Sequence, residues 1–528
     1  MRALLVNPAV PDAYWTGRAS LPFARRRALL PPLGLITVAA LLPPSWECRL
    51  VDMNVEPLRD GEIAAADVVL VTGMLVQRES MQEVLRRCRA LGVRTLVGGP
   101  YATALPGELA AADHIVLGEA EELVPHVAAA LELRDAARIY REERKPDLAA
   151  APVPRFDLLA RKAYHQAALQ FSRGCPHRCE FCDIVSLFGH TPRVKSPAQV
   201  VAELDAIRAT GFAGDVFFVD DNFIGNRKAV RSLLPQISSW RRRTGARLGF
   251  YTEASMDLAE DPELVDSMVD AGFSAVFLGI ETPNPEALRE TGKRQNLNGD
   301  PISRIHTLLS RGLDVWGGFI LGFDSDGPDI FDRMVDFVRR AAIPYAMVGL
   351  LGAPPGTALW KRLKREGRLR TGTAFEGGDQ FGLTNVISRL PAEQLLEGYH
   401  RVMDALYAPA AYFQRCRDNL GRWNGRHAGA RRVSIAELRS GLRAVIAQGF
   451  RGRYRREYWR FLGWAAAHQP RKLATAIRHA AAGHHYITYT RETVLPALER
   501  TRAELMAAAA SAAATAGRRC AGSSPGAG

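Results

Sequence analysis

Short apolar runs alternate with segments of helical periodicity over the first 130 residues. Each apolar run ends in a turn rich in Gly, Asn or Pro, and the intervening segments repeat their apolar residues every three or four positions. Strands that alternate with helices in this way predict a parallel, doubly wound sheet. The expected strands are residues 2–8, 47–53, 67–74, 95–100 and 114–121, with helices expected at 31–43 and 80–92.

A second series of alternating strands and helices follows further along the chain. Its units occupy about 190 residues, whereas a complete eight-unit barrel needs about 250, so the pattern predicts a partial (β/α)6 TIM barrel, open on one side. Functional groups of such barrels lie at the carboxyl ends of the strands. The expected strands are residues 168–174, 215–222, 245–255, 275–282, 314–326 and 345–357.

The strand pattern stops near residue 390, and amphipathic helices replace it. The last residues are rich in Ala, Gly and Ser, a low-complexity composition for which we predict disorder. The sequence therefore divides into a doubly wound α/β domain (1–140), a Pro-rich linker (141–165), the barrel (166–390), a basic helical domain (391–505) and a tail (506–528).

Net charge is concentrated in the helical domain. The 528 residues carry a formal charge of +13, and residues 411–481 alone hold 16 basic and three acidic side chains, so the remaining chain is neutral overall. A nucleic-acid partner for the whole chain is therefore not expected. Residues 451–480 place an aromatic face beside a cationic one, which suits a solvated helix, a cap on the barrel mouth or contact with an anionic membrane surface.

The seven cysteines do not form the pattern of a disulfide framework, and only Cys175, Cys179 and Cys182 cluster. The N-terminus lacks the features of a secretory signal, so we predict a cytoplasmic protein. Peripheral contact of this protein with a membrane is an alternative that the sequence leaves open. The C-x3-C-x2-C cluster follows the first barrel strand, where three thiolates can hold one metal centre. Zinc completed by His177 or His190 is one alternative; a [4Fe–4S] cluster with one open iron is the other.

The cysteine motif, with Phe181 before its last cysteine, resembles the signature of the radical S-adenosylmethionine superfamily. The resemblance implies that Cys175, Cys179 and Cys182 ligate a [4Fe–4S] cluster, whose open iron binds S-adenosylmethionine. Reductive cleavage of that cofactor would then release a 5′-deoxyadenosyl radical that abstracts hydrogen from a substrate. An electron donor of the flavodoxin or ferredoxin type is implied as well.

Polar residues end the later barrel strands. Asp220, Asp221 and Asn222 follow one strand and, by the family's pattern, are the expected contacts of the S-adenosylmethionine amino group. A helix cap or turn is the plain alternative for such a cluster. Glu253 and Glu281 end the next two strands and, by the same analogy, are expected to contact cofactor or substrate.

The N-terminal domain resembles the Rossmann-like cobalamin-binding domain of cobalamin-dependent radical enzymes. The matching segments are VNP, PPLGL, GGPYAT and LGEAEE. The motif D-x-H-x-x-G is absent from the sequence, so no protein histidine is expected below the cobalt, and Tyr101 stands where the GGPHAT turn has histidine. A fold whose pocket is vestigial or holds another ligand is the alternative. The residues expected at the corrin are Asn7, Thr72, Gly73, Gly98, Gly99, Tyr101 and Gly118.

These resemblances imply a cobalamin-dependent methyltransferase that acts on an unactivated carbon of a lipid or natural-product intermediate. The same cofactors could drive cyclisation or rearrangement without net methylation, and this alternative stays open at the level of sequence. An RNA-modifying enzyme is disfavoured, because Cys48 and Cys88 are isolated and do not supply the extra N-terminal cluster of the methylthiotransferases.

Overall fold

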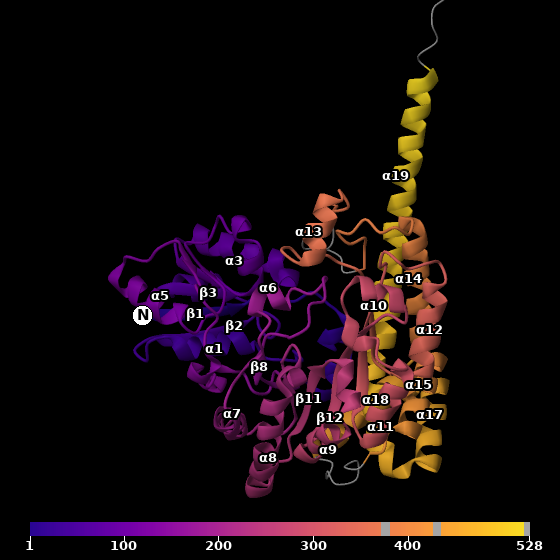
Figure 1. The fold of residues 1–528 in the computed structure, drawn as a ribbon. Coiled ribbons are helices and arrows are strands. Elements are labelled where there is room, and N and C mark those ends of the chain that lie inside the picture. The colour runs from indigo at the N-terminus through magenta and orange to yellow at the C-terminus, as the bar shows by residue number, and fades with distance from the viewer. Residues whose placement is uncertain (371–380, 426–434, 522–528) are drawn as a thin grey trace, which may run out of the picture.

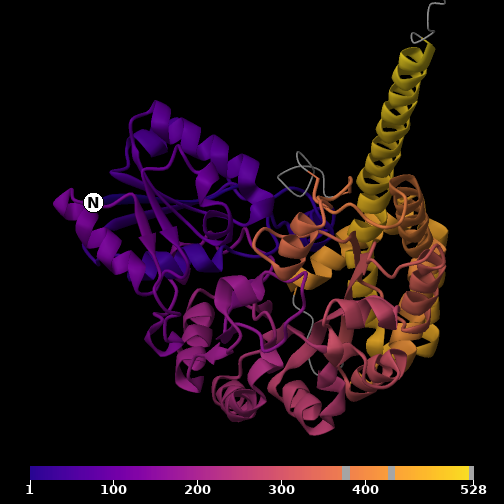
Figure 2. The ribbon, with the colours of Figure 1, turned by 45° about the horizontal axis from the view of Figure 1, so that its top comes forward.

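Three regions of the chain follow one another in space (Figure 1). The computed structural model describes residues 1–370, 381–425 and 435–521. An α/β domain built from the first residues lies beside a barrel, and the C-terminal helices, in orange and yellow, stand along the far side of that barrel (Figures 1 and 2). The predicted fold class is confirmed in each of its three parts.

The first domain is a parallel sheet with strand order β2-β1-β3-β4-β5-β6. Helices α1 (Leu33–Leu41) and α5 (Leu123–Leu133) contact each other on one face, whereas α2 (Asp60–Ala64) and α3 (Arg78–Ala90) contact each other on the other. The order reverses between β1 and β3, so the crevice for a ligand lies at the carboxyl ends of these two strands. The strands are β1 (Arg2–Asn7), β2 (Glu47–Asp52), β3 (Val68–Thr72), β4 (Arg94–Gly98), β5 (His114–Leu117) and β6 (Ile139–Arg141).

The barrel sheet is parallel throughout and has the order β14-β13-β12-β11-β10-β7, so its neighbours are consecutive barrel units. A two-stranded antiparallel pair, β8 (Ser172–Arg173) with β9 (Arg193–Val194), brackets the cysteine loop. The barrel strands are β7 (Ala167–Leu169), β10 (Asp215–Phe218), β11 (Gly249–Ala254), β12 (Phe273–Glu281), β13 (Asp314–Leu321) and β14 (Ala346–Leu350). The main helices between them are α7 (Pro197–Ala209), α8 (Arg227–Thr244), α9 (Pro262–Ala271), α11 (Pro301–Arg311) and α12 (Ile330–Arg340).

Helices of the C-terminal region cover the last barrel strand. Tyr399 and Tyr407 of α14 (Ala392–Tyr407) donate hydrogen bonds to main-chain carbonyls of β14, which occupies the edge of the sheet. Covering an edge strand prevents it from pairing with other chains. The further helices are α15 (Pro409–Arg422), α16 (Ile435–Ala444), α17 (Arg455–His468), α18 (Leu473–Tyr489) and α19 (Leu495–Ala521).

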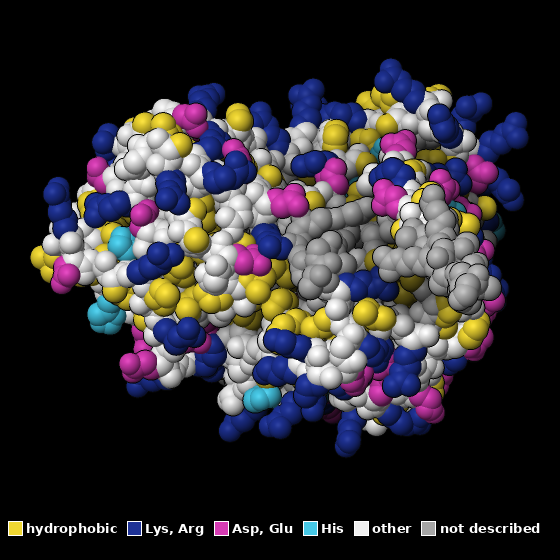
Figure 3. All heavy atoms as spheres, turned by 90° about the horizontal axis from the view of Figure 1, so that it is seen from above, with side chains coloured by type: hydrophobic (Ala, Val, Ile, Leu, Met, Phe, Trp, Pro, Cys, Tyr) yellow, Lys and Arg dark blue, Asp and Glu magenta, His cyan; other side chains and the backbone are white. Residues whose placement is uncertain are grey.

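The aromatic face expected on residues 451–480 turns out to belong largely to the core. Tyr454, Tyr458 and Phe461 are buried and surround the ring of Phe413 on α15. Most of the apolar side of α17 is therefore used for packing between helices and is not available to a membrane, although Trp459 is 44% exposed. Seen from above, the side toward which α19 projects, the molecule shows basic side chains interspersed with acidic ones, so that side carries no single basic field (Figure 3).

A loop near the N-terminus packs against the C-terminal helices. After β1 the chain leaves the first sheet and packs on α18, where Ser20 Oγ donates to Ala481 O at 2.6 Å and His485 Nε2 lies 3.0 Å from Ala13 O. The first domain is thereby fixed to the C-terminal helices as well as to the barrel. Nothing in the local sequence pattern predicts this contact.

The expected disorder of residues 506–528 is wrong for the part that the structure describes. Helix α19 continues through Ala521 and projects from the molecule as a long rod (Figure 1). The physical reason is composition, since the segment is dominated by alanine, the residue with the highest helix propensity. Residues 522–528 lie outside the described residues.

Candidate functional site

The three clustered cysteines lie in the loop between β8 and the short helix α6 (Ile184–Phe188). Gly174 opens this loop at φ +92°, where a Cβ atom would lie 2.9 Å from the carbonyl oxygen of Thr191, so only glycine fits. The amide of Cys182 donates to Cys179 O at 3.1 Å, which folds the loop back on itself. Burial raises the pKa of the Cys182 thiol to about 12, so a metal centre must displace its proton on binding.

Groups with positive or donor character surround the sulfur atoms. Asn222 Nδ2 lies 3.9 Å from Cys175 Sγ, and Gln295 Nε2 lies 3.7 Å from Cys179 Sγ. The ammonium of Lys293 interacts electrostatically with Cys179 and Cys182. Hydrogen bonds and positive charge near the sulfurs stabilise and tune a thiolate-bound iron–sulfur cluster. The donor set therefore fits such a cluster. Sequence reasoning missed Lys293 and Gln295, which carry no motif of their own.

The cysteines are not arranged as a single-ion site. In the described parts of the chain, no three His, Cys, Asp or Glu side chains converge closely enough to hold one metal ion. Zinc requires such convergence, because its ligands lie about 2.0–2.3 Å from one centre. A cluster spreads its cysteine ligands over several irons, so the arrangement favours the cluster over the zinc alternative.

The acidic residues after β10 have different tasks. Asp220 is buried and accepts hydrogen bonds from the main-chain amides of Phe171 and Ser172 and from the Ser172 hydroxyl, so it positions the strand that leads into the cysteine loop. Its carboxylate is thereby occupied, which corrects the expectation that it contacts the cofactor. Asp221 is half-buried beside the amide of Gly174, at 3.4 Å, and burial raises its pKa to about 7.

The two glutamates at the next strand ends also differ. Glu253 is half-buried, and burial together with the charges of Asp221 and Asp220 raises its pKa to about 8. Glu281 adopts φ +68° at a bulge in β12 and forms an ion pair with Lys293 at 2.6 Å. Glu281 therefore holds the lysine that faces the cysteine loop, whereas a contact of Glu253 with cofactor or substrate stays a prediction.

Buried ion pairs attach the cysteine loop to the first domain. Glu119, in the turn after β5, pairs with Arg173 at 2.9 Å and with Arg193 at 2.6 Å, and Glu121 pairs with Arg173 at 2.7 Å. Arg173 and Arg193 belong to β8 and β9, the strands that bracket the cysteines. The turn of one domain is thus clamped to the strands that carry the cysteine loop of the other.

A second clamp holds the same loop from the C-terminal side. Arg362 of α13 (Ala358–Arg365) pairs with Glu180, between the cysteines, at 2.7 Å and with Asp324 at 2.8 Å. Asp324 also pairs with Arg368, and these cations lower its pKa to about 2 against the opposing effect of burial. The cysteine loop is therefore fixed between the first domain and the end of the barrel.

We expect Glu119→Gln to lower the free energy of unfolding by about 3 kcal/mol, because it leaves two arginines in a largely buried position without their common carboxylate. The matched control is Glu122→Gln, which removes an exposed pair with Arg144 at 3.6 Å and is expected to cost less than about 1 kcal/mol. Thermal unfolding of the apoproteins measures the difference. Equal melting temperatures for the two variants would show that the clamp does not stabilise the fold.

Residues expected at the corrin gather at the switch point of the first sheet. Gly99 has φ +91° and ψ −175°, and a Cβ atom there would lie 2.3 Å from Thr72 Oγ1, next to the backbone of Gly73. Asn7 Nδ2 donates to Asp52 Oδ1 at 2.9 Å, which fixes the end of β1. Asn7, Thr72, Gly98 and Gly99 are all half-buried, so a ligand can approach this edge closely.

Two of the expected corrin residues have close neighbours within the first domain. Tyr101 is fully buried in the core of the first domain, where its hydroxyl donates to Glu108 at 2.8 Å and accepts from Gln82 at 2.9 Å. Its side chain is therefore not available to a ligand, which corrects that prediction. At Gly118 the close neighbour is the carboxyl of Glu142, 2.3 Å from where a Cβ would lie, so this glycine serves the domain's own packing.

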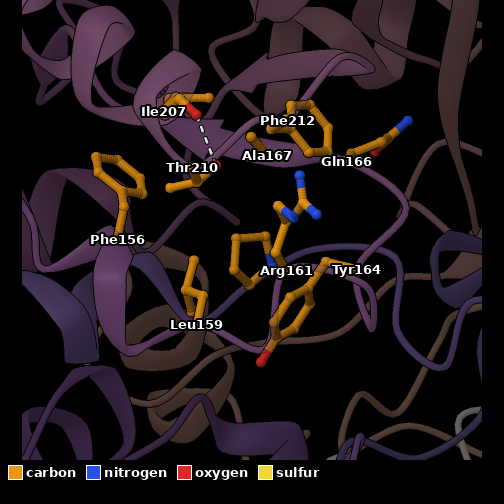
Figure 4. A pocket seen from close by; sticks show the side chains of 10 residues that line it. Phe156, Leu159, Arg161, Tyr164, Gln166, Ala167, Ile207, Thr210 and Phe212 are labelled. Atoms are coloured by element: carbon orange, nitrogen blue, oxygen red, sulfur yellow. Dashed lines mark hydrogen bonds between the residues drawn. The ribbon is translucent and has the colours of Figure 1, made fainter.

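A small cavity of about 30 Å³ lies away from the strand ends, where the linker meets β7 and α7 (Figure 4). Phe156, Leu159 and Tyr164 line it on the linker side. Because it opens at the amino-terminal side of the barrel, it does not belong to the candidate site.

A doubly wound domain with an open switch point, clamped to a barrel with a three-cysteine loop, defines a radical S-adenosylmethionine protein with a cobalamin-binding domain. Comparison with known families agrees, because residues 169–338 match the radical SAM superfamily and residues 20–128 match the B12 binding domain. Residues 357–496 match a domain of unknown function.

Related chains extend the comparison over nearly the whole length. An uncharacterized methyltransferase of Synechocystis sp. is 41% identical over 93% of this chain and 92% of its own. The hopanoid C-2 methylase of Rhodopseudomonas palustris is 35% identical, with 93% and 94% covered. The chain belongs to the cobalamin-dependent radical SAM methyltransferases, whose cofactors are a [4Fe–4S] cluster, S-adenosylmethionine and cobalamin.

Two solved structures share the fold. The methyltransferase TsrM from Kitasatospora setae, with cobalamin and a [4Fe–4S] cluster bound, has a TM-score of 0.59 at 16% identity, over 91% of this chain and 99% of that one. The radical enzyme OxsB, with aqua-cobalamin and S-adenosylmethionine bound, has a TM-score of 0.59 at 14% identity, over 94% and 80%.

Proposed function

We propose that this enzyme methylates an unactivated carbon of an apolar, lipid-like substrate such as a hopanoid. The inner face of the barrel sheet carries the observation that supports this substrate class. On β12 and β13 the half-exposed residues alternate with buried ones, and among them are Phe277, Trp316 and Ile320. Tyr251 on β11 stacks on Phe217 at 4.6 Å and meets Trp316 at 5.0 Å.

Such a surface suits a rigid hydrocarbon. Aromatic and aliphatic side chains supply contact area without hydrogen-bonding groups that would need polar partners in the substrate. The extensive similarity to a hopanoid C-2 methylase supports the same class of substrate. Net methylation is favoured over rearrangement because two relatives that match nearly the whole chain are named an uncharacterized methyltransferase and a hopanoid C-2 methylase.

Individual residues take separate roles in this proposal. When bound, the cluster with S-adenosylmethionine supplies a radical, and cobalamin supplies the methyl group. Cys175, Cys179 and Cys182 hold the cluster, and Asn222 donates toward the first of these sulfurs. Asp221 and Glu253 bind the polar groups of S-adenosylmethionine from the adjoining strand ends. The corrin lies against Asn7, Thr72, Gly73, Gly98 and Gly99.

Anaerobic turnover tests the proposal. With a low-potential reductant, S-adenosylmethionine and a hopanoid, we expect a product heavier by one CH2 group, together with equal amounts of 5′-deoxyadenosine and S-adenosylhomocysteine. A parallel reaction with free tryptophan, a polar compound that is bound as substrate in a solved structure of TsrM, is expected to give no methylated product. A rearranged product without S-adenosylhomocysteine, or methylation of the polar compound alone, would contradict the proposed reaction or substrate.

Two partners complete the proposal. A flavodoxin or ferredoxin of the cytoplasm supplies the electron, because the chain offers no second metal cluster motif in its sequence. The C-terminal region contacts a membrane surface from which a lipid substrate is drawn. The concentration of basic residues at 411–481 supports this contact, since the cytoplasmic leaflet is negatively charged.

A further inference from the structure

Helix α16 and the π-helix that continues it (Val445–Phe450) carry an exposed apolar stripe. Its members follow one another at intervals of three or four residues, which places them along one side of a helix. The exposed fractions are 71% for Ile435, 68% for Leu438, 61% for Leu442, 40% for Ile446 and 66% for Phe450. A continuous exposed stripe of large apolar side chains marks an interaction surface.

The other side of the same helix is anchored to the protein. Ala444 and Gln448 are buried, and Arg443 donates to the main-chain carbonyl of Phe23 in the N-terminal loop. The helix also contacts α18. The apolar stripe is therefore presented outward by a helix that is already fixed in place.

Positive charge borders the stripe. Residues 438–461 contain seven arginines and a single acid, Glu457. Arg439, Arg451, Arg453 and Arg455 are exposed. Trp459, next to the end of the stripe, is 44% exposed and donates through Nε1 to Gly449 O at 2.8 Å. Exposed apolar side chains beside arginines and an anchored tryptophan match the chemistry of an interface between water and anionic lipid.

We propose that this stripe, Ile435 to Phe450, is the surface with which the protein docks on an anionic bilayer. The contact is interfacial, as no helix in the described residues has the length and apolar character needed to span a membrane. The stripe inserts among the acyl chains near the headgroups while the arginines pair with lipid phosphates. The inference rests on the proposed lipid substrate for its purpose, whereas its test needs no turnover. It assigns a role to part of the domain of unknown function.

Vesicle flotation of the full chain tests this surface. The probe is phosphatidylcholine vesicles with about 30% phosphatidylglycerol at low salt. We expect the wild-type protein to float with them and Leu438→Glu/Leu442→Glu to bind about tenfold less or weaker still. Leu133→Glu is the matched control, because Leu133 is 79% exposed on the first domain, outside the stripe, and its variant should float like wild type. Thermal melts establish that all three proteins fold equally.

Other outcomes would contradict the proposed docking surface. Wild-type protein that stays with the aqueous phase, or a double variant that floats as well as wild type, overturns the proposal. A concentration-dependent dimer that the double variant abolishes, without vesicle binding, identifies a second copy of the chain as the occupant and also overturns it. Turnover of detergent-dispersed substrate separates the two hypotheses: a protein that floats but does not methylate contradicts the proposed function and leaves the docking surface intact.

Discussion

Cys182→Ser is expected to give a folded protein that binds little iron and forms no 5′-deoxyadenosine, with turnover reduced by on the order of a thousandfold or more. Cys182 belongs to a loop that is fixed from both sides by ion pairs of Glu119 and Arg362, so the loop can keep its position when one sulfur is lost. The serine hydroxyl stays protonated at neutral pH and is a much weaker ligand for iron than a thiolate. Iron and sulfide content and the visible spectrum measure the result.

The matched control for this variant is Cys48→Ser. Cys48 is half-buried in the first domain, and its thiol lies 3.9 Å from the carbonyl oxygen of Trp46. This variant should retain full iron content and activity. Normal iron content in Cys182→Ser, or stoichiometric zinc in the wild-type protein, would remove the basis for the cluster assignment.

Gly99→Val is expected to weaken corrinoid binding by about tenfold to a hundredfold, because its φ and ψ lie in a region that essentially only glycine occupies and strain there costs about 1–3 kcal/mol. A Cβ at this position would also meet Thr72 Oγ1 at 2.3 Å. Cleavage of S-adenosylmethionine uses the other domain, so 5′-deoxyadenosine should still form while methylated product is lost. Cobalamin titration and product analysis measure the two effects.

Gly107→Val serves as the control for this substitution. Gly107 belongs to the same domain, has nothing within 4 Å of the position of a Cβ, and adopts no positive φ. It should bind corrinoid like the wild type. If Gly99→Val binds cobalamin normally, the switch-point edge is not the corrin site.

Most strands could be predicted from the sequence because each is a short apolar run that ends at a turn. The exceptions are β6 and β9, which have three and two residues and too few positions to show any alternation, whereas the expected strand 168–174 spans both β7 and β8. An alanine-rich composition fits both a disordered low-complexity segment and a strong helix former. For this reason the sequence predicts disorder in the C-terminal tail, where the structure continues the helix α19. Helical spacing places the aromatic residues of α17 on one face but does not tell whether that face contacts solvent, a membrane or another helix.

The cysteine motif was likewise accessible from the sequence, whereas its surroundings were not. Cys175, Cys179 and Cys182 lie within eight residues, so their proximity is fixed by the chain itself. Gln295 and Lys293 reach the same sulfurs from more than a hundred residues away. Asp220 and Tyr101 belong to matching motifs, yet the fold turns Asp220 to the main chain and Tyr101 to the core.

The sequence by itself determined the order of the three regions, the grouping of the three cysteines and the place of the basic charge, because each is encoded by residues close together in the chain. The tertiary structure decided which strand-end carboxylates are engaged within the protein, which pairs clamp the cysteine loop between domains, and that α16, more than α17, exposes its apolar side. These properties depend on contacts between distant segments, and local periodicity carries no information about the partner that a side chain will meet.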